Sequence, residues 1–189
     1  MDVVRAQREV RTAYRSGSVG QVYSGLVWVA SAAAWAVWTP TVGILTLLLG
    51  GFFIYPVTSV VSRLLGGAGR IGRGNPFGEL GVTAPIVGPL CIPVAGAAAL
   101  HDINWFYPAF MIVMGAHYLP FSTLYGMRSF VWLGAGMWTA GMAVGWWMPG
   151  LSVVAAGATG VVLIGFGLAA GRAHRRPDAR SPQTENRVP

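Results

Sequence analysis

The uncharged stretch at residues 81–100, GVTAPIVGPLCIPVAGAAAL, decides the fold class of this chain. A helix rises about 1.5 Å per residue, so about 20 apolar residues cross a bilayer core about 30 Å thick. The stretch has that length and carries no charged side chain. Further uncharged runs of similar length flank it, at about residues 19–38, 41–62, 105–126, 129–147 and 151–170. The sequence therefore predicts an all-α, polytopic membrane helix bundle with six transmembrane helices in residues 18–171.

The composition excludes an ordinary soluble domain. Of the 189 residues, 54% are hydrophobic and 10% are charged, whereas soluble domains carry about 25% charged residues. The formal charge of +7 comes from arginines alone, and they lie beside the predicted spans, so we expect no nucleic-acid partner. Cys91 is the single cysteine, which excludes a disulfide within the chain.

The charged residues predict the orientation of the bundle. Arginines precede the first span and follow the second, fourth and sixth, whereas the opposite connections hold one charged residue, Asp102. Cytoplasmic loops concentrate basic residues, so we expect a multi-pass protein of the cell membrane with both termini cytoplasmic. Trp38, Trp105, Trp146 and Trp147 then lie at the outer interface, which tryptophan favours.

Both ends of the chain differ from the spans. At about 100° per residue, Val3, Ala6 and Val10 fall on one side of a helix and arginines on the other. We expect residues 1–17 to form an interfacial amphipathic helix on the inner leaflet; the alternative is a solvated basic start. The arginines that we expect to contact anionic lipid headgroups are Arg5, Arg8, Arg15, Arg70 and Arg73. Residues 172–189 are polar, which predicts a disordered cytoplasmic tail.

The loop after the second span contains a glycine pattern, GAGRIG at residues 67–72. It matches the dinucleotide-binding pattern G-x-G-x-x-G, but that pattern acts between a strand and a helix. Here it follows a transmembrane helix, so we interpret it as a flexible glycine loop. The alternative is a headgroup contact through Arg70 and Arg73.

The third predicted span contains three prolines four residues apart: Pro85, Pro89 and Pro93. Each proline removes a backbone donor, so the helix should kink or partly unwind on one face. Freed carbonyls in lipid need partners, so we expect this span to face the protein interior or a wet cavity. A structural kink alone is the alternative to a broken, substrate-binding helix.

The second and fourth spans share the pattern G-x4-P-x-[ST]-[ST], beginning at Gly51 and Gly115, and each carries a stripe of hydroxyl groups. If the stripes face each other, they line a polar crevice open to the cytoplasm. The alternative is hydrogen bonding within the helix interfaces. The candidate ligand-binding residues are Tyr55, Thr58 and Ser59 in the second span and His117, Tyr118, Ser122 and Tyr125 in the fourth.

His117 is the deepest ionisable side chain of the predicted spans, which makes it a functional candidate. A metal site needs several ligands, and the other two histidines lie at the membrane edges. We therefore expect neither a metal nor a cofactor. A neutral, hydrogen-bonded structural histidine is the alternative to a ligand-binding one.

Several stretches resemble a family of small six-helix bacterial membrane proteins that is a domain of unknown function. The stretches are AQREVRTAY at residues 6–14, GFFIYP at 51–56, NPF at 75–77, GAHYLPF at 115–121 and LYG at 124–126. The resemblance implies a bacterial cytoplasmic membrane protein. It implies no activity.

Two functions are open on these residues. The chain has no G-x-S-x-G, no H-E-x-x-H and no intramembrane carboxylate pair, so we do not expect an enzyme. We expect binding or translocation of a small solute or lipid through a cytoplasm-facing polar crevice between the second, third and fourth spans. The alternative is a non-catalytic membrane scaffold or partner subunit whose polar residues serve helix packing. Membrane lipids are the expected partners, and a homodimer is compatible with either function.

Overall fold

The computed structural model describes residues 2–175, and every element within them is helical. The α-helices are α1 (Val3–Ala13), α2 (Ser18–Val37), α3 (Pro40–Phe52), α4 (Ile54–Leu64), α5 (Gly78–Leu90), α6 (Ile92–His101), α7 (Phe106–Tyr125), α8 (Ser129–Trp147) and α9 (Ser152–Arg175). The all-α prediction is confirmed for these residues. Each predicted span corresponds to one helix or to one broken pair, α3 with α4 and α5 with α6. Helix α9 continues into the first residues of the predicted tail, and the rest of that tail lies outside the described residues.

Length and composition allow two of the described helical stretches to cross a membrane, namely Gly78–His101 and Pro149–His174. The pair α3 and α4 makes a third if it is one span, with a bend of 49° between its halves. Helices α2, α7 and α8 are 20, 20 and 19 residues long. They contain more serine and aromatic residues and are less apolar on the same measure.

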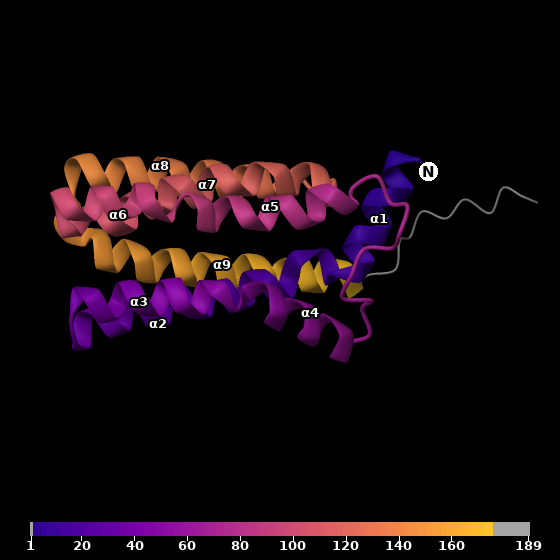
Figure 1. The fold of residues 1–189 in the computed structure, drawn as a ribbon, viewed down its shortest axis with the longest axis horizontal. Helices are drawn as coiled ribbons and strands as arrows, with labels where there is room; N and C mark the ends of the chain where they lie inside the picture. The colour runs from indigo at the N-terminus through magenta and orange to yellow at the C-terminus, as the bar shows by residue number, and fades with distance from the viewer. Residues whose placement is uncertain (1, 176–189) are drawn as a thin grey trace, which may run out of the picture.

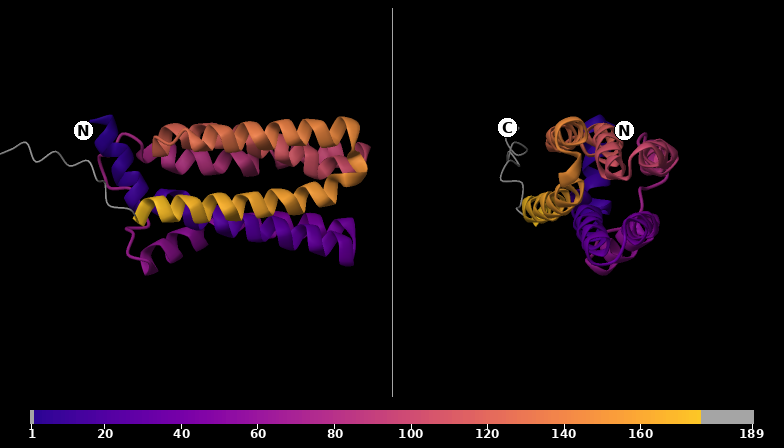
Figure 2. Two further views of the ribbon diagram at one scale, coloured as in Figure 1. Left: turned by 180° about the vertical axis from the view of Figure 1, so that it is seen from behind. Right: turned by 90° about the vertical axis from the view of Figure 1, so that its left-hand side faces the viewer.

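The helices of the predicted spans form two layers (Figures 1 and 2). Helix α2 packs against α3, α4 and α9 in one layer, and α7 packs against α5, α6 and α8 in the other. Small residues allow close contact within each layer. A Cβ on Gly25 of α2 would lie 2.5 Å from the carbonyl oxygen of Gly160 in α9, and a Cβ on Gly115 of α7 would lie 2.6 Å from that of Gly134 in α8. Such contacts hold helices together where lipid supplies no hydrophobic driving force.

Large side chains fill the space between the layers. The Trp28 ring of α2 lies 6.1 Å from the Tyr107 ring and 5.6 Å from the Phe110 ring of α7. The Ser31 and Tyr107 hydroxyls are hydrogen-bonded at 2.7 Å. At the other end of the bundle, Phe130 is fully buried against several aromatic rings. The core is therefore an aromatic seam between two glycine-packed layers.

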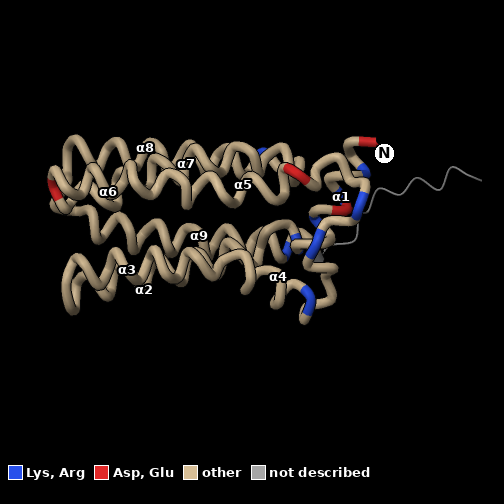
Figure 3. Tube along the Cα trace, in the orientation of Figure 1, with Lys and Arg blue, Asp and Glu red and all other residues tan. Residues whose placement is uncertain are grey.

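The described arginines gather at one end of the bundle, where α1 also lies (Figure 3). We call this the arginine-rich end. The chain turns from α1, which crosses this end, into α2 through Arg15, Ser16 and Gly17, with φ values of 52°, 58° and 76°. Left-handed φ values are unusual for arginine and serine, so the local sequence does not favour this turn. The contacts of α1 with the bundle therefore hold its direction. A Cβ on Gly17 would lie 3.2 Å from the Phe130 ring.

The third predicted span is broken, but it lies at the edge of the bundle. The predicted break in the third span is present, because α5 ends at Leu90 and α6 begins at Ile92. The prediction that this span faces the interior is wrong. Pro89 and Pro93 are exposed, Pro85 is half-buried, and only 17% of the span is buried. The span lies at the edge of its layer, where the neighbouring α7 covers one side.

Candidate functional site

Helix α1 is the amphipathic helix predicted at the N-terminus, but its apolar face contacts protein. Ala6, Val10 and Ala13 are buried against the arginine-rich end. Gln7 Nε2 donates a hydrogen bond to the Thr123 carbonyl at 2.7 Å, and Arg11 Nη1 donates to the Tyr125 carbonyl at 2.6 Å. Helix α1 is thereby fixed to the end of α7, and its apolar face is covered by protein except at Val3, which is exposed.

The glycine loop lies against α1 and is fixed there by Glu9. The Gly72 amide donates to Glu9 Oε1 at 2.8 Å, and Asn75 Nδ2 donates to Glu9 Oε2 at 3.1 Å. The Gly69 amide donates to the Ala13 carbonyl at 3.0 Å. A Cβ on Gly67 would lie 2.8 Å from that same oxygen, so close approach to α1 explains this glycine. We call α1 with loop residues 65–77 the cap.

Tyr14, at the end of α1, lies between the two predicted hydroxyl stripes. It lies close to Tyr55 of α4 and to Tyr125 of α7. Burial, together with a smaller effect of Tyr55, raises the pKa of Tyr14 to about 12, whereas Arg63 opposes the shift. The side chain is therefore a neutral hydrogen-bonding group at physiological pH.

The stripe on α4 ends in buried hydroxyls. Tyr55 is 51% exposed, but the Oγ atoms of Thr58, Ser59 and Ser62 are buried without a hydrogen-bond partner among the described residues. Thr58 faces α2, because its Oγ1 lies 3.2 Å from where a Cβ on Gly20 would be. Ser62 is fully buried, on the turn that leads to the cap loop.

The stripe on α7 is mostly satisfied by the protein. Tyr118 Oη donates to Gln21 Oε1 of α2 at 3.0 Å, and Ser122 Oγ donates to the Leu119 carbonyl of its own helix at 2.7 Å. The Tyr125 ring stacks on Phe130 with centroids 5.3 Å apart. These residues therefore already have partners.

The imidazole of His117 is buried among apolar and aromatic groups. Its ring packs edge-on against Phe121, with centroids 5.0 Å apart, and it faces Gly88 of α5. The Nδ1 atom is buried and has no hydrogen-bond partner in the described part of the chain. Within residues 2–175, no group of three or more His, Cys, Asp or Glu side chains could hold a metal ion.

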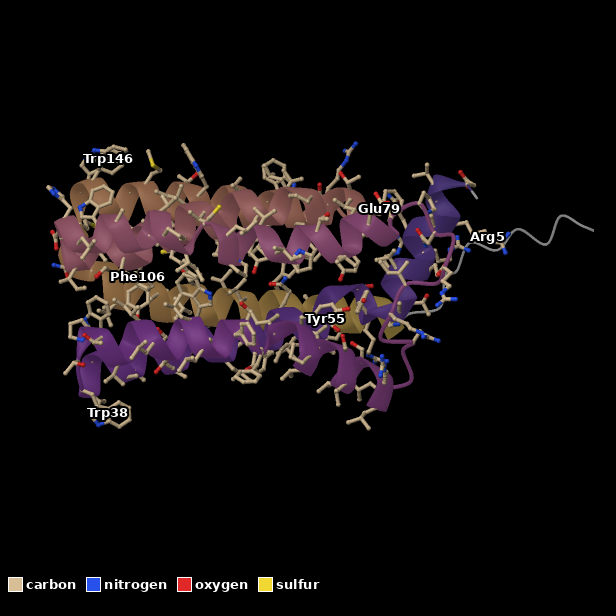
Figure 4. The ribbon with its side chains drawn as sticks, in the orientation of Figure 1. Arg5, Trp38, Tyr55, Glu79, Phe106 and Trp146 are labelled. Atoms are coloured by element: carbon tan, nitrogen blue, oxygen red, sulfur yellow. The ribbon has the colours of Figure 1, made fainter. Side chains whose placement is uncertain are left out.

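The structure brings the predicted residues to one end of the bundle but does not align the two stripes across an open crevice. Helix α2 lies between the stripes: its Gly20 packs against Thr58 of the α4 stripe, and its Gln21 accepts a hydrogen bond from Tyr118 of the α7 stripe. Tyr14 lies beside Tyr55, next to the cap. Figure 4 shows Tyr55 in the layer of α2, α4 and α9, in the half nearer this end. The predicted headgroup arginines Arg5, Arg8, Arg70 and Arg73 are exposed at the same end, and Arg15 donates to the Leu65 carbonyl at 2.7 Å.

Four residues at this end were not among the predicted site residues: Glu9, Tyr14, Gln21 and Asn75. Gln21 and Ser24 lie three positions apart in an otherwise apolar span, which is a detectable polar face. Glu9 is the one acidic residue among the arginines of α1. The partners of Tyr14 and Asn75 come from segments far away in the sequence, so no local pattern reveals them.

Residues 3–170 match a family of unknown function, DUF7010. No curated protein and no solved structure shows significant similarity to this chain. The match covers the described fold from α1 into α9, including the cap, both polar stripes and the aromatic seam. The chain therefore belongs to the family of unknown function DUF7010.

Proposed function

We propose that all six predicted spans cross the membrane, with the cap on the cytoplasmic side. The charge distribution supports this orientation, because basic residues concentrate in cytoplasmic segments. Exposed Trp38 and Trp146 lie at the end opposite Arg5, where an outer interface would be (Figure 4). The spans beyond the two or three apolar ones are long enough for a bilayer about 30 Å thick.

We further propose that the protein binds a small, uncharged polar solute, or the polar part of a lipid, in the half of the bundle nearest the cap. One observation carries this proposal: four buried polar atoms there have no partner within the described residues. They are Thr58 Oγ1, Ser59 Oγ, Ser62 Oγ and His117 Nδ1. An unsatisfied buried polar group costs about 1–3 kcal/mol. A ligand with hydroxyl or amide groups would remove part of that cost.

The ligand would be a neutral hydrogen-bonding molecule. No carboxylate or arginine is among the four groups, and the side chains that pack against His117 are aromatic or aliphatic. A charged ligand would lose its hydration without gaining a counter-charge. Translocation requires access from both sides of the membrane, so binding from the cytoplasm is the first step to test.

The cap is the proposed entrance. It closes this end through the buried side chains of Ala6, Val10 and Ala13 and through polar contacts, chiefly those of Gln7, Glu9 and Arg11. These contacts are separate from the glycine contacts within the layers, so the cap can open without disturbing the layers.

Cysteine accessibility tests the proposal. Cys91→Ser removes the single thiol of the chain, and Ser62→Cys then adds one at the buried stripe. The matched control is Leu49→Cys, because Leu49 is exposed on the outer side of α3, where lipid would surround it. Both variants are treated in inverted membrane vesicles with a membrane-impermeant, cationic methanethiosulfonate.

We expect the Ser62→Cys thiol to react faster than the Leu49→Cys thiol, and Glu9→Ala to increase only the first rate. Equal, slow rates in both variants, with and without Glu9→Ala, would show that water does not reach the stripe. That outcome would favour the second candidate function, a membrane scaffold. The close glycine packing and the internal hydrogen bonds of Tyr118 and Ser122 support this second candidate.

A further inference from the structure

An open groove runs along the surface of the layer formed by α2, α3, α4 and α9, separate from the buried stripes. Helix α2 forms its floor, and α4 and α9 form its walls. Its volume is about 490 Å³, within the range of about 300–1,000 Å³ that is usual for small-molecule sites. None of the hydroxyl-stripe residues lines it. The groove is therefore distinct from the proposed solute site.

The bend between α3 and α4 opens the groove. Helix α4 turns away by 49° from the direction of α3, so it diverges from α2 and α9 toward the arginine-rich end (Figure 1). Pro56 lies in the first turn of α4, where it removes a backbone donor and crowds the carbonyl four residues earlier. On the opposite wall, Gly167 of α9 packs directly on Ser18 of α2.

The walls of the groove are apolar along its length and basic at one end. Val22, Leu26, Val57 and Val61 are among the apolar residues. The basic end carries the guanidinium groups of Arg15 and Arg172. No acidic residue is among the described residues that line the groove.

Among the described residues, both guanidinium groups keep donors free for an anion. Arg15 uses Nη1 for the Leu65 carbonyl, and an arginine has five N–H donors in total. Arg172 is exposed and lies on the last turns of α9. A phosphate between them would receive charge-assisted hydrogen bonds from two sides. The basic end lies at the level where the cytoplasmic headgroup layer would be.

We propose that this groove is a binding site for one anionic glycerophospholipid. The phosphate lies between Arg15 and Arg172, and one acyl chain follows Val22, Leu26 and Val57 toward the membrane centre. The assignment rests on the membrane orientation proposed above but not on the solute site. A general attraction of arginines to the membrane surface would not select one lipid. Here a single groove offers two arginines to the phosphate and an apolar wall to the acyl chain.

Native mass spectrometry of the protein released from nanodiscs tests the headgroup contact. The nanodiscs contain equal amounts of phosphatidylglycerol and phosphatidylcholine. We expect one phosphatidylglycerol to be retained in preference, and Arg172→Gln to lower that preference about fivefold, as removal of one arginine near anionic lipid predicts. Arg128→Gln is the matched control, because Arg128 is an exposed arginine at the same end outside the groove. It should leave the preference unchanged.

A second pair of variants tests the acyl-chain part. Leu26→Trp fills the groove, whereas Leu45→Trp adds the same bulk on the exposed side of α3 away from it. Only Leu26→Trp should reduce the retained lipid. Equal losses for Arg172→Gln and Arg128→Gln, equal effects of the two tryptophans, or no preference for phosphatidylglycerol would each overturn the proposal. The thiol rates of Ser62→Cys do not depend on any of these results, so the two proposals fail separately.

Discussion

Replacement of Gly160 by alanine should destabilise the protein because it separates α9 from α2. The added Cβ would lie 2.7 Å from the Gly25 carbonyl oxygen and 2.9 Å from the Val29 amide nitrogen. An ordinary contact is about 3.4 Å or more, so the two backbones must move apart by several tenths of an ångström. Backbone atoms cannot rotate away as a side chain can. Overpacking of this kind costs about 1–3 kcal/mol.

Gly165→Ala is the control on the same helix, because a Cβ at Gly165 meets nothing within 4 Å. Both variants gain the higher helix propensity of alanine, about 1 kcal/mol, so their difference isolates the contact. We expect Gly160→Ala to unfold at a temperature roughly 2–12 °C below that of Gly165→Ala, at about 2–4 °C per kcal/mol. Circular dichroism in detergent micelles measures both. Equal unfolding temperatures would refute the close α2–α9 packing.

Three further predictions concern the arginine-rich end. Tyr118→Phe removes the buried hydrogen bond to Gln21, so chemical denaturation should show a loss of about 1 kcal/mol; no loss would contradict the bond. Glu9→Ala should increase amide hydrogen exchange in the cap loop at least severalfold, whereas Glu79→Ala, which has no contact there, should not. Burial and two nearby arginines lower the pKa of His174. The unfolded state therefore binds more protons, and stability should fall as pH drops below about 6.5; His174→Gln should weaken that dependence of the unfolding temperature.

The positions of the helices could be predicted because uncharged runs of sufficient length leave few alternatives. Each predicted span contains a helix or a broken pair of helices. Hydropathy supports two or three spans on a strict measure, and the others rest on the alternation of arginine-rich and arginine-free connections. Which helices pair could not be predicted. The contact of α2 with α9 joins segments at opposite ends of the chain, and only the glycine positions hint at it.

The candidate site could be predicted only in part. The polar side chains of α4 and α7 were visible as stripes, but their partners come from α1 and α2. An amphipathic pattern such as that of α1 indicates a buried apolar face, and it does not say whether lipid or protein covers that face. The prolines of the third span illustrate the same limit. They predict a break, but the side of the helix that meets the protein depends on its neighbours.

The shared pattern of the second and fourth spans shows how those neighbours decide the outcome. Pro120 lies inside α7, which stays continuous, whereas α3 and α4 break just before Pro56. The glycine of the pattern explains the difference. Gly115 is held against α8, with its Cβ position 2.6 Å from a carbonyl oxygen, whereas nothing lies within 4 Å of the Cβ position of Gly51. A helix packed on both sides cannot bend, but one that is open to lipid can, and its bend shapes the proposed lipid groove. A Pro56→Ala variant that straightens this span should therefore lose the preference for phosphatidylglycerol while it keeps the glycine-packed layers.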